Sequence, residues 1–130
     1  MIPKKLHFIY GLSEDFGGKP FSFCHWAAIK SAQINNPEYE THFWYHYKPE
    51  TYYFQEIESS MNLHQVDLPN EVYGNKIRHV AHKADFLRLK ILNEFGGVYQ
   101  DLDTVTVKSF DSLLNNNFVI GRETVEGSTV

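Results

Sequence analysis

The stretch that most constrains this chain covers residues 82–104 and reads HKADFLRLKILNEFGGVYQDLDT. It predicts a helix that stops at Gly96 and Gly97, turns, and leads into a short strand that ends in two carboxylates, Asp101 and Asp103. Because side chains alternate across a strand, the two carboxylates would point to the same side. Such a pair is suited to holding a metal ion.

The same helix places two charges where apolar residues are expected. At about 100° per residue, Leu89, Leu92 and Phe95 share the side predicted to face the core. Asp85 and Arg88 fall on that side too. Charges on a core face are costly unless they are paired or used. A buried structural ion pair and a binding site both explain them, and the neighbouring carboxylates favour a site.

Apolar runs and helical patterns alternate along the rest of the chain. The predicted strands are residues 6–10, 39–47, 63–68 and 118–121, and the predicted helices are residues 20–35 and 52–61. Pro20 suits the first turn of the first helix, and Thr51 suits the cap of the second. Residues 69–76 predict a loop, and residues 110–114 predict a helical turn.

This alternation predicts an α/β fold with a mostly parallel sheet and helices on both faces. Val105 and Val107 would extend the acidic strand or begin another. In such sheets ligands bind beyond the carboxyl ends of the strands, where Tyr10 and the two carboxylates are expected.

Composition narrows the class of protein. The 130 residues, 42% hydrophobic and 15% aromatic, predict one folded domain over residues 1–130. A formal net charge of -4 argues against nucleic acid as a partner. The single cysteine, Cys24, excludes a cysteine-rich zinc site, and the seven histidines show no zinc motif. Without a long apolar run or a signal peptide, we expect no transmembrane segment and a cytoplasmic location, with the inner membrane surface as an alternative.

Two segments carry a resemblance to a known family. HKADFLRLKILNEFGGVYQDLDTV resembles the signature of the DXD-containing sugar transferases of glycosyltransferase family 32, and IPKKLHFIYG is similar to their first strand. The resemblance implies a GT-A-like, Rossmann-like fold and a nucleotide-diphosphate sugar donor. It also implies a divalent cation on the diphosphate, Mn²⁺ or else Mg²⁺. Since the family's enzymes are longer, it covers their donor-binding part, and the fold is expected to be incomplete at the C-terminus without the acceptor-binding part.

The resemblance also implies roles for five residues. Asp103 would ligate the metal, with Asp101 beside it and reaching the ribose and sugar. Asp85 and Arg88 would contact the donor sugar. Tyr10, where the family usually has Trp, would pack against the base. The predicted function is transfer of the sugar to a saccharide, lipid-linked or protein acceptor, as in polysaccharide biosynthesis, and no catalytic residue is assigned.

Two other functions stay open. Residues 101–105, DLDTV, match the nucleophile motif DxDx[TV] of haloacid dehalogenase-type phosphatases, whose first Asp attacks phosphorus. That motif closes the first strand of its fold, whereas only 27 residues follow Asp103 here. The other alternative is a module that binds a nucleotide sugar without turning it over.

Overall fold

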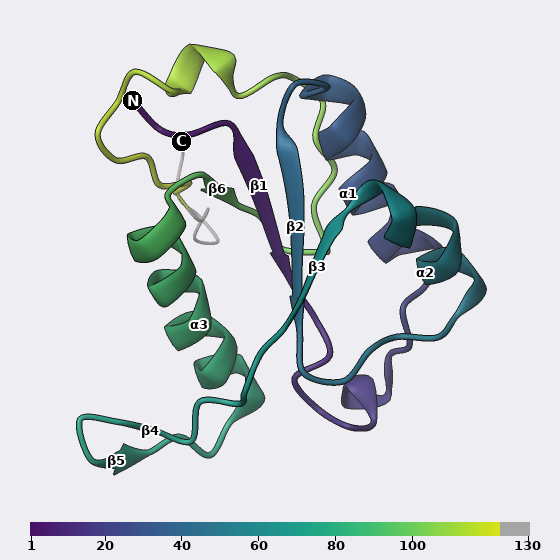
Figure 1. The fold of residues 1–130 in the computed structure, drawn as a ribbon, viewed down its shortest axis with the longest axis vertical. Coiled ribbons are helices and arrows are strands. Elements are labelled where there is room, and N and C mark those ends of the chain that lie inside the picture. Colours follow the sequence, from purple (N-terminus) through teal and green to yellow (C-terminus); the bar gives the residue numbers. More distant parts are fainter. Residues whose placement is uncertain (123–130) are drawn as a thin grey trace, which may run out of the picture.

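The centre of the structure is a four-stranded sheet in which every strand pair is parallel. The structure is a computed structural model and describes residues 1–122, so residues 123–130 of the predicted domain lie outside the described part. In sheet order the strands are β3 (Asn62–Gln65), β2 (Glu40–Tyr45), β1 (Lys5–Ile9) and β6 (Val98–Tyr99). Helices α1 (Phe23–Asn35) and α2 (Tyr52–Ile57) lie on one side of the sheet, and α3 (Val80–Phe95) lies on the other (Figure 1). This arrangement confirms the predicted α/β fold with a mostly parallel sheet.

Strand β1 is buried on both faces because alternate residues enter two different cores. Leu6 and Phe8 join the core beneath α1 and α2, and Ile9 joins the core beneath α3. Leu6 and Phe8 are both fully buried, and burial of such a side chain stabilises the fold by roughly 1.5–3 kcal/mol. From Leu6 to Ile9, the sequence of this central parallel strand is therefore apolar on both faces apart from the buried His7.

Helices α1 and α2 differ in detail from the prediction. Helix α1 begins three residues after Pro20, and the backbone N–H of Ser22 donates to Nδ1 of His25 at 3.0 Å at its start. Helix α2 begins after Thr51 as expected, but the Thr51 hydroxyl donates to the carbonyl of Phe21 at 2.6 Å and does not cap the helix. A tertiary contact therefore replaces the local cap at this position.

Helix α3 turns a different face to the sheet than the sequence predicted. The buried residues are Leu87 and Ile91, while Leu89 is 67% exposed. Two stripes of α3 have the same helical spacing, so the sequence did not distinguish them. The buried stripe holds residues 84, 87 and 91, and the predicted one holds residues 85, 88 and 92. The prediction that Asp85 and Arg88 lie on a core face is therefore wrong. Their side chains are 58% and 33% exposed and lie beside the buried stripe.

Strand β6 is shorter than predicted and ends before the two carboxylates. It pairs with β1 only at Val98 and Tyr99, after which the backbone N–H of Gln100 donates to the carbonyl of His7 at 3.2 Å and the chain leaves the sheet. Asp101 and Asp103 lie in the turn that follows, so the strand alternation used to align them does not apply.

The predictions for the connecting segments have mixed outcomes. The helical turn at residues 110–114 is confirmed by a 3-10 helix at Asp111–Leu113. The loop at residues 69–76 holds a small hairpin of β4 (Glu71–Val72) and β5 (Asn75–Lys76). No strand forms at residues 105–107 or 118–121, which the structure describes as irregular. Val107 is 85% exposed and belongs to neither hydrophobic core.

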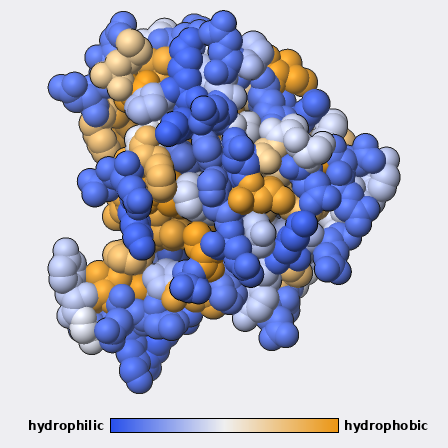
Figure 2. All heavy atoms as spheres, in the orientation of Figure 1, coloured by the Kyte–Doolittle hydropathy of each residue, from blue (hydrophilic) through white to orange (hydrophobic). Residues whose placement is uncertain are grey.

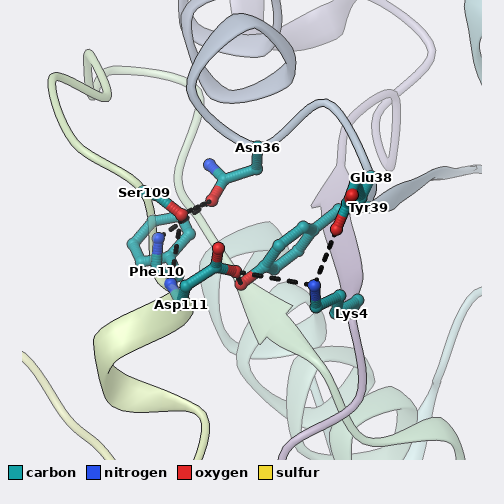
Figure 3. Close-up of polar contacts among 7 residues, drawn as sticks. All are labelled: Lys4, Asn36, Glu38, Tyr39, Ser109, Phe110 and Asp111. Atoms are coloured by element: carbon teal, nitrogen blue, oxygen red, sulfur yellow. Dashed lines mark hydrogen bonds and ion pairs between the residues drawn. The ribbon is translucent and has the colours of Figure 1, made fainter.

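A polar network ties the segment after β6 to the far side of the sheet (Figure 3). Oδ1 of Asn36, just after α1, accepts the backbone N–H of Phe110 at 2.9 Å. The Tyr39 hydroxyl donates to Oδ1 of Asp111 at 2.7 Å, and Lys4 lies 3.9 Å from the same oxygen. Asn36 is 1% exposed, so its bonds satisfy a group that would otherwise be costly to bury. The network fixes where the chain goes after the two carboxylates.

The hydrophobic surface is unevenly distributed. Figure 2 shows its larger areas on the side of the view that holds α3 and the β4–β5 hairpin, while the side of α1 and α2 is mostly hydrophilic. On α3, the apolar residues Leu89 and Val80 are 67% and 45% exposed. Among the helices of residues 1–122, none has the length and hydrophobicity needed to span a membrane.

Candidate functional site

The predicted site residues follow the carboxyl ends of two neighbouring strands. Tyr10 comes directly after β1, and Asp101 and Asp103 come shortly after β6. Because β1 and β6 are parallel neighbours, these residues leave the sheet toward the same edge. Helix α3 also begins near this edge (Figure 1).

Gly11 allows the chain to turn sharply behind Tyr10. Its φ is +74°, and a Cβ at this position would lie 2.2 Å from the carbonyl oxygen of Tyr47. That approach is used, because the backbone N–H of Tyr47 donates to the carbonyl of Gly11 at 2.8 Å. Only glycine fits this turn without strain, and the turn places the loop of residues 12–19 beside the sheet edge.

Four side chains form a continuous series from α3 to the end of β6. Arg88 forms an ion pair with Asp85 one turn earlier in α3, and its guanidinium lies 4.6 Å from the centre of the Tyr99 ring. The Tyr99 hydroxyl donates to Oδ1 of Asp101 at 2.9 Å. We call Asp85, Arg88, Tyr99 and Asp101 the α3–β6 contact series. It brings together three of the five predicted site residues.

Tyr99 was missed by the sequence analysis. Burial, with the Asp101 carboxylate next in importance, raises the pKa of Tyr99 far above its ordinary value, so the hydroxyl stays protonated and donates. Its ring supports Arg88 through a cation–π contact. The available signal was its position two residues before Asp101 in the predicted strand, where alternation predicts both side chains on one side.

Arg88 keeps part of its guanidinium unused. Its Nε is buried and has no hydrogen-bond partner among residues 1–122. A buried donor without a partner costs about 1–3 kcal/mol. The Arg88 side chain as a whole is 33% exposed, so a polar ligand would reach it at its exposed part and not at Nε.

The turn between β6 and the polar network, residues 101–105, is called here the acidic turn. The Thr104 hydroxyl donates to the carbonyl of Asp101 at 2.7 Å, and the Gln100 side chain donates to the Thr106 hydroxyl at 2.9 Å. The backbone N–H of Thr106 donates in turn to the Ser31 hydroxyl of α1 at 2.9 Å. The acidic turn is therefore held at both ends.

The donor set of the acidic turn fits a hard divalent cation that is only partly bound by protein. Asp101 and Asp103 are both exposed and offer carboxylate oxygens, the ligands that Mg²⁺ and Mn²⁺ prefer. No cluster of three or more Asp, Glu, His or Cys suited to a metal occurs within the described residues. Mg²⁺-type sites commonly use one or two carboxylates with water and substrate phosphates, so two are sufficient.

Tyr10 lines an apolar pocket of about 260 Å³ at the end of β1. Its ring stacks on Phe16 with the centroids 5.5 Å apart and the planes 8° apart. Its hydroxyl donates to the carbonyl of Lys19 at 2.5 Å, and burial raises the pKa of this hydroxyl to about 12. Ala84 of α3 lines the same pocket and precedes Asp85, so the pocket adjoins the α3–β6 contact series. No member of the α3–β6 contact series lines the pocket itself, and Asp103 does not line it either.

A second pocket, about 280 Å³, lies at the opposite end of β1. Pro3, Leu92 and Phe118 are among its lining residues, and no charged side chain lines it. Its lining includes the amide side chains of Asn116 and Asn117, but none of the predicted site residues lines it, so the candidate site is the pocket at Tyr10.

The comparison with known proteins identifies the class to which this site belongs. Residues 24–119 match the family described as glycosyltransferase sugar-binding region containing DXD motif. The chain therefore belongs to this family. This membership confirms the resemblance to DXD-containing glycosyltransferases. It does not agree with the alternative of a haloacid dehalogenase-type phosphatase, which is therefore wrong.

The chain is similar to one protein in sequence and to one solved structure in fold. It is 32% identical over 126 residues to glucan organizing enzyme 1 of Cryptococcus neoformans var. grubii serotype A (strain H99), which covers 95% of this chain and 34% of that protein. The chain thus spans about a third of the length of this relative. The solved structure named PaToxG Glycosyltransferase is similar with a TM-score of 0.56 and 21% identity, over 85% of this chain and 45% of that one. This likeness confirms the GT-A-like fold.

Proposed function

We propose that this chain binds the nucleotide-diphosphate sugar donor of a glycosyltransferase, and that the whole protein transfers the sugar to an acceptor. The observation that carries the proposal is the α3–β6 contact series beside the Tyr10 pocket. It combines a planar apolar site with polar groups at the carboxyl ends of parallel strands, where α/β sheets bind nucleotides.

The two parts of the site suit the two ends of such a donor. The stacked rings of Tyr10 and Phe16 give a fixed aromatic wall, against which a nucleobase would pack. Sugar hydroxyls both donate and accept hydrogen bonds. Asp85 supplies an acceptor and Arg88 supplies a fork of donors, so together they would orient a sugar. Because Tyr99 already holds Arg88, little side-chain freedom remains to be lost on binding.

The acidic turn would hold a divalent cation through Asp103 and Asp101, with Mn²⁺ or Mg²⁺ as the proposed ion. When bound, such a cation neutralises negative charge that develops on a leaving diphosphate. The chain's own contribution is to keep two carboxylates exposed and to restrain one of them, Asp101. The Tyr99 hydroxyl restrains Asp101 from the sheet side, and Thr104 closes the turn behind it.

The acceptor is proposed for the whole protein, because this chain spans about a third of its fungal relative. The name of that relative, glucan organizing enzyme 1, refers to a polysaccharide. It supports a saccharide acceptor over a lipid-linked or protein acceptor. The proposed process is therefore polysaccharide biosynthesis or remodelling.

A thermal-shift screen of uridine, guanosine and adenosine diphosphate sugars, each with and without Mn²⁺, tests donor binding. We expect one nucleotide class to raise the melting temperature, and only when Mn²⁺ is present. A shift that is equal without the cation, or no shift with any donor, would contradict the proposal. Measurement of slow donor hydrolysis by the same protein then separates a transferase part from a module that only binds, since a pure binder releases no free nucleotide.

A further inference from the structure

His7 is a buried histidine that the proposed function does not use. It lies in the middle of β1 and is 0% exposed. Its ring lies between two fixed partners. The indole N–H of Trp44 donates to Nδ1 at 3.1 Å, and Nε2 lies 2.8 Å from the carbonyl oxygen of Gly96. Because the indole can only donate, Nδ1 must accept, and the proton of the neutral ring lies on Nε2. His7 therefore donates from Nε2 to Gly96.

Gly96 belongs to the turn that joins α3 to β6. Its backbone N–H donates to the carbonyl of Leu92 at 3.0 Å, which is the last hydrogen bond of the helix. The carbonyl of Gly96 accepts its hydrogen bond from the His7 ring and not from the helix. Gly97 follows with a φ of +99°, and a Cβ there would lie 2.7 Å from the carbonyl oxygen of Lys5 and 3.0 Å from Nε2 of His7. The turn thus packs directly on β1 and on the His7 ring.

The same histidine also holds the other end of the short strand. His7 pairs with Tyr99 in the sheet, and its carbonyl accepts the backbone N–H of Gln100 at 3.2 Å. Its ring fixes the residue that ends α3, and its backbone fixes the residue after Tyr99. Arg88 lies on α3 and its aromatic partner lies on β6, so their stacking depends on how these two elements are held relative to each other.

We propose that His7 is a positioning residue that acts through Gly96 to hold Arg88 against Tyr99 and so keeps the α3–β6 contact series in register. The expected effect of His7 on sugar binding rests on the proposed function, whereas its expected effect on the contact between Arg88 and Tyr99 does not. Burial, the largest cause, lowers the pKa of His7 to about 4, with His42, Lys5 and His64 acting in the same direction and the bond to Gly96 acting against them. The ring therefore stays neutral and keeps its single N–H toward Gly96 near neutral pH.

Two substitutions separate the two ring contacts. In His7→Gln the side-chain amide reaches the position of Nε2, so a donor to the Gly96 carbonyl is kept. The shorter side chain of His7→Asn reaches only the position of Nδ1. It can accept the indole N–H of Trp44, but it cannot donate to Gly96. His42→Gln is the matched control, because His42 stacks on His7 at 5.2 Å without contacting the turn. Each protein is examined by nuclear magnetic resonance without ligand and by calorimetry with Mn²⁺, a nucleotide sugar and the bare nucleoside diphosphate.

We expect His7→Gln and His42→Gln to keep the ring-current shift that Tyr99 imposes on the Arg88 side chain, and His7→Asn to lose it. In His7→Asn the preference for the nucleotide sugar over the bare diphosphate should fall by about tenfold, the effect of one hydrogen bond. An unchanged Arg88 shift in His7→Asn would overturn the proposal. If the wild type binds no nucleotide sugar, the proposed function fails, and the Arg88 shifts still decide the role of His7.

The wild-type protein gives a test that needs no variant to fold. A long-range proton–nitrogen spectrum reports which ring nitrogen of His7 carries the proton. The proposal requires a neutral ring protonated at Nε2. A ring protonated at Nδ1, or at both nitrogens near neutral pH, would overturn it.

Discussion

The hydroxyl of Tyr99 donates to Oδ1 of Asp101 at 2.9 Å, while the ring of the same residue carries the guanidinium of Arg88. One side chain thus links the helix that supplies Asp85 and Arg88 to the turn that supplies Asp101. We therefore expect Tyr99→Phe, which keeps the ring and removes the hydroxyl, to weaken nucleotide-sugar binding by up to about tenfold and to lower the free energy of unfolding by only about 1 kcal/mol. Calorimetry and urea unfolding measure the two effects. Tyr73→Phe, at a residue 98% exposed in the hairpin, is the control and should change neither.

Arg88→Ala distinguishes a binding pair from a structural ion pair. Because Asp85 and Arg88 are 58% and 33% exposed, loss of the pair should lower the free energy of unfolding by at most about 1 kcal/mol, with a similar amount from the cation–π contact. The larger effect should be on affinity for the nucleotide sugar, with affinity for the bare nucleoside diphosphate nearly unchanged. Arg78→Ala, an exposed residue before α3, serves as the control. A loss of about 3–5 kcal/mol, typical of a broken buried pair, together with normal sugar binding would return both residues to a structural role.

The buried His7 should make stability depend on pH. Its pKa is lowered from 6.5 in the unfolded chain to about 4, so the unfolded state binds more protons between these values. The stability is fully present above pH 6.5 and is lost as the pH falls toward 4, by at most roughly 1.4 kcal/mol per pH unit. Urea unfolding of the wild type and His7→Gln in this range should show a shallower slope for the variant, although His25 and His64, whose pKa values burial also lowers, keep part of it. Equal slopes would show that His7 does not stay neutral when buried.

Gly97→Ala tests the close packing of the turn on β1. The substitution is strained by a φ of +99° and also places a Cβ 2.7 Å from a backbone oxygen, which cannot move aside easily. Gly74→Ala, with a φ of +80° and open space around it, measures the strain alone. We expect Gly74→Ala to lower the free energy of unfolding by about 1 kcal/mol and Gly97→Ala to lower it by clearly more. Similar losses would mean that the turn accommodates the added methyl group.

The sequence was sufficient for the fold because segments such as Leu6 to Ile9, apolar apart from His7, alternate with helical patterns. It was insufficient where the outcome depends on a partner element. Two stripes of α3 share one spacing, and only packing against Ile9 and Trp44 selects the one with Leu87 and Ile91. The length of β6 depends likewise on where β1 stops accepting its hydrogen bonds.

The candidate site was predictable in its residues and less so in its geometry. Asp85, Arg88 and Asp101 were named from their pattern, and the structure places them in one series of contacts. Tyr99 was not named, because an aromatic residue in a short strand reads as core. His7 was not named either, since its two hydrogen bonds are to residues far away in the sequence.

The central claim is that the acidic turn binds the metal complex of a nucleotide sugar, and calorimetric titration of Asp103→Asn tests it most directly. Asn keeps the size of the side chain and removes the charge that a divalent cation requires. Glu56→Gln removes an exposed carboxylate of α2 and is the control. We predict that Mn²⁺ strengthens nucleotide-sugar binding in the wild type and in Glu56→Gln and has no effect on binding by Asp103→Asn. Equal Mn²⁺ dependence in all three proteins would contradict the account.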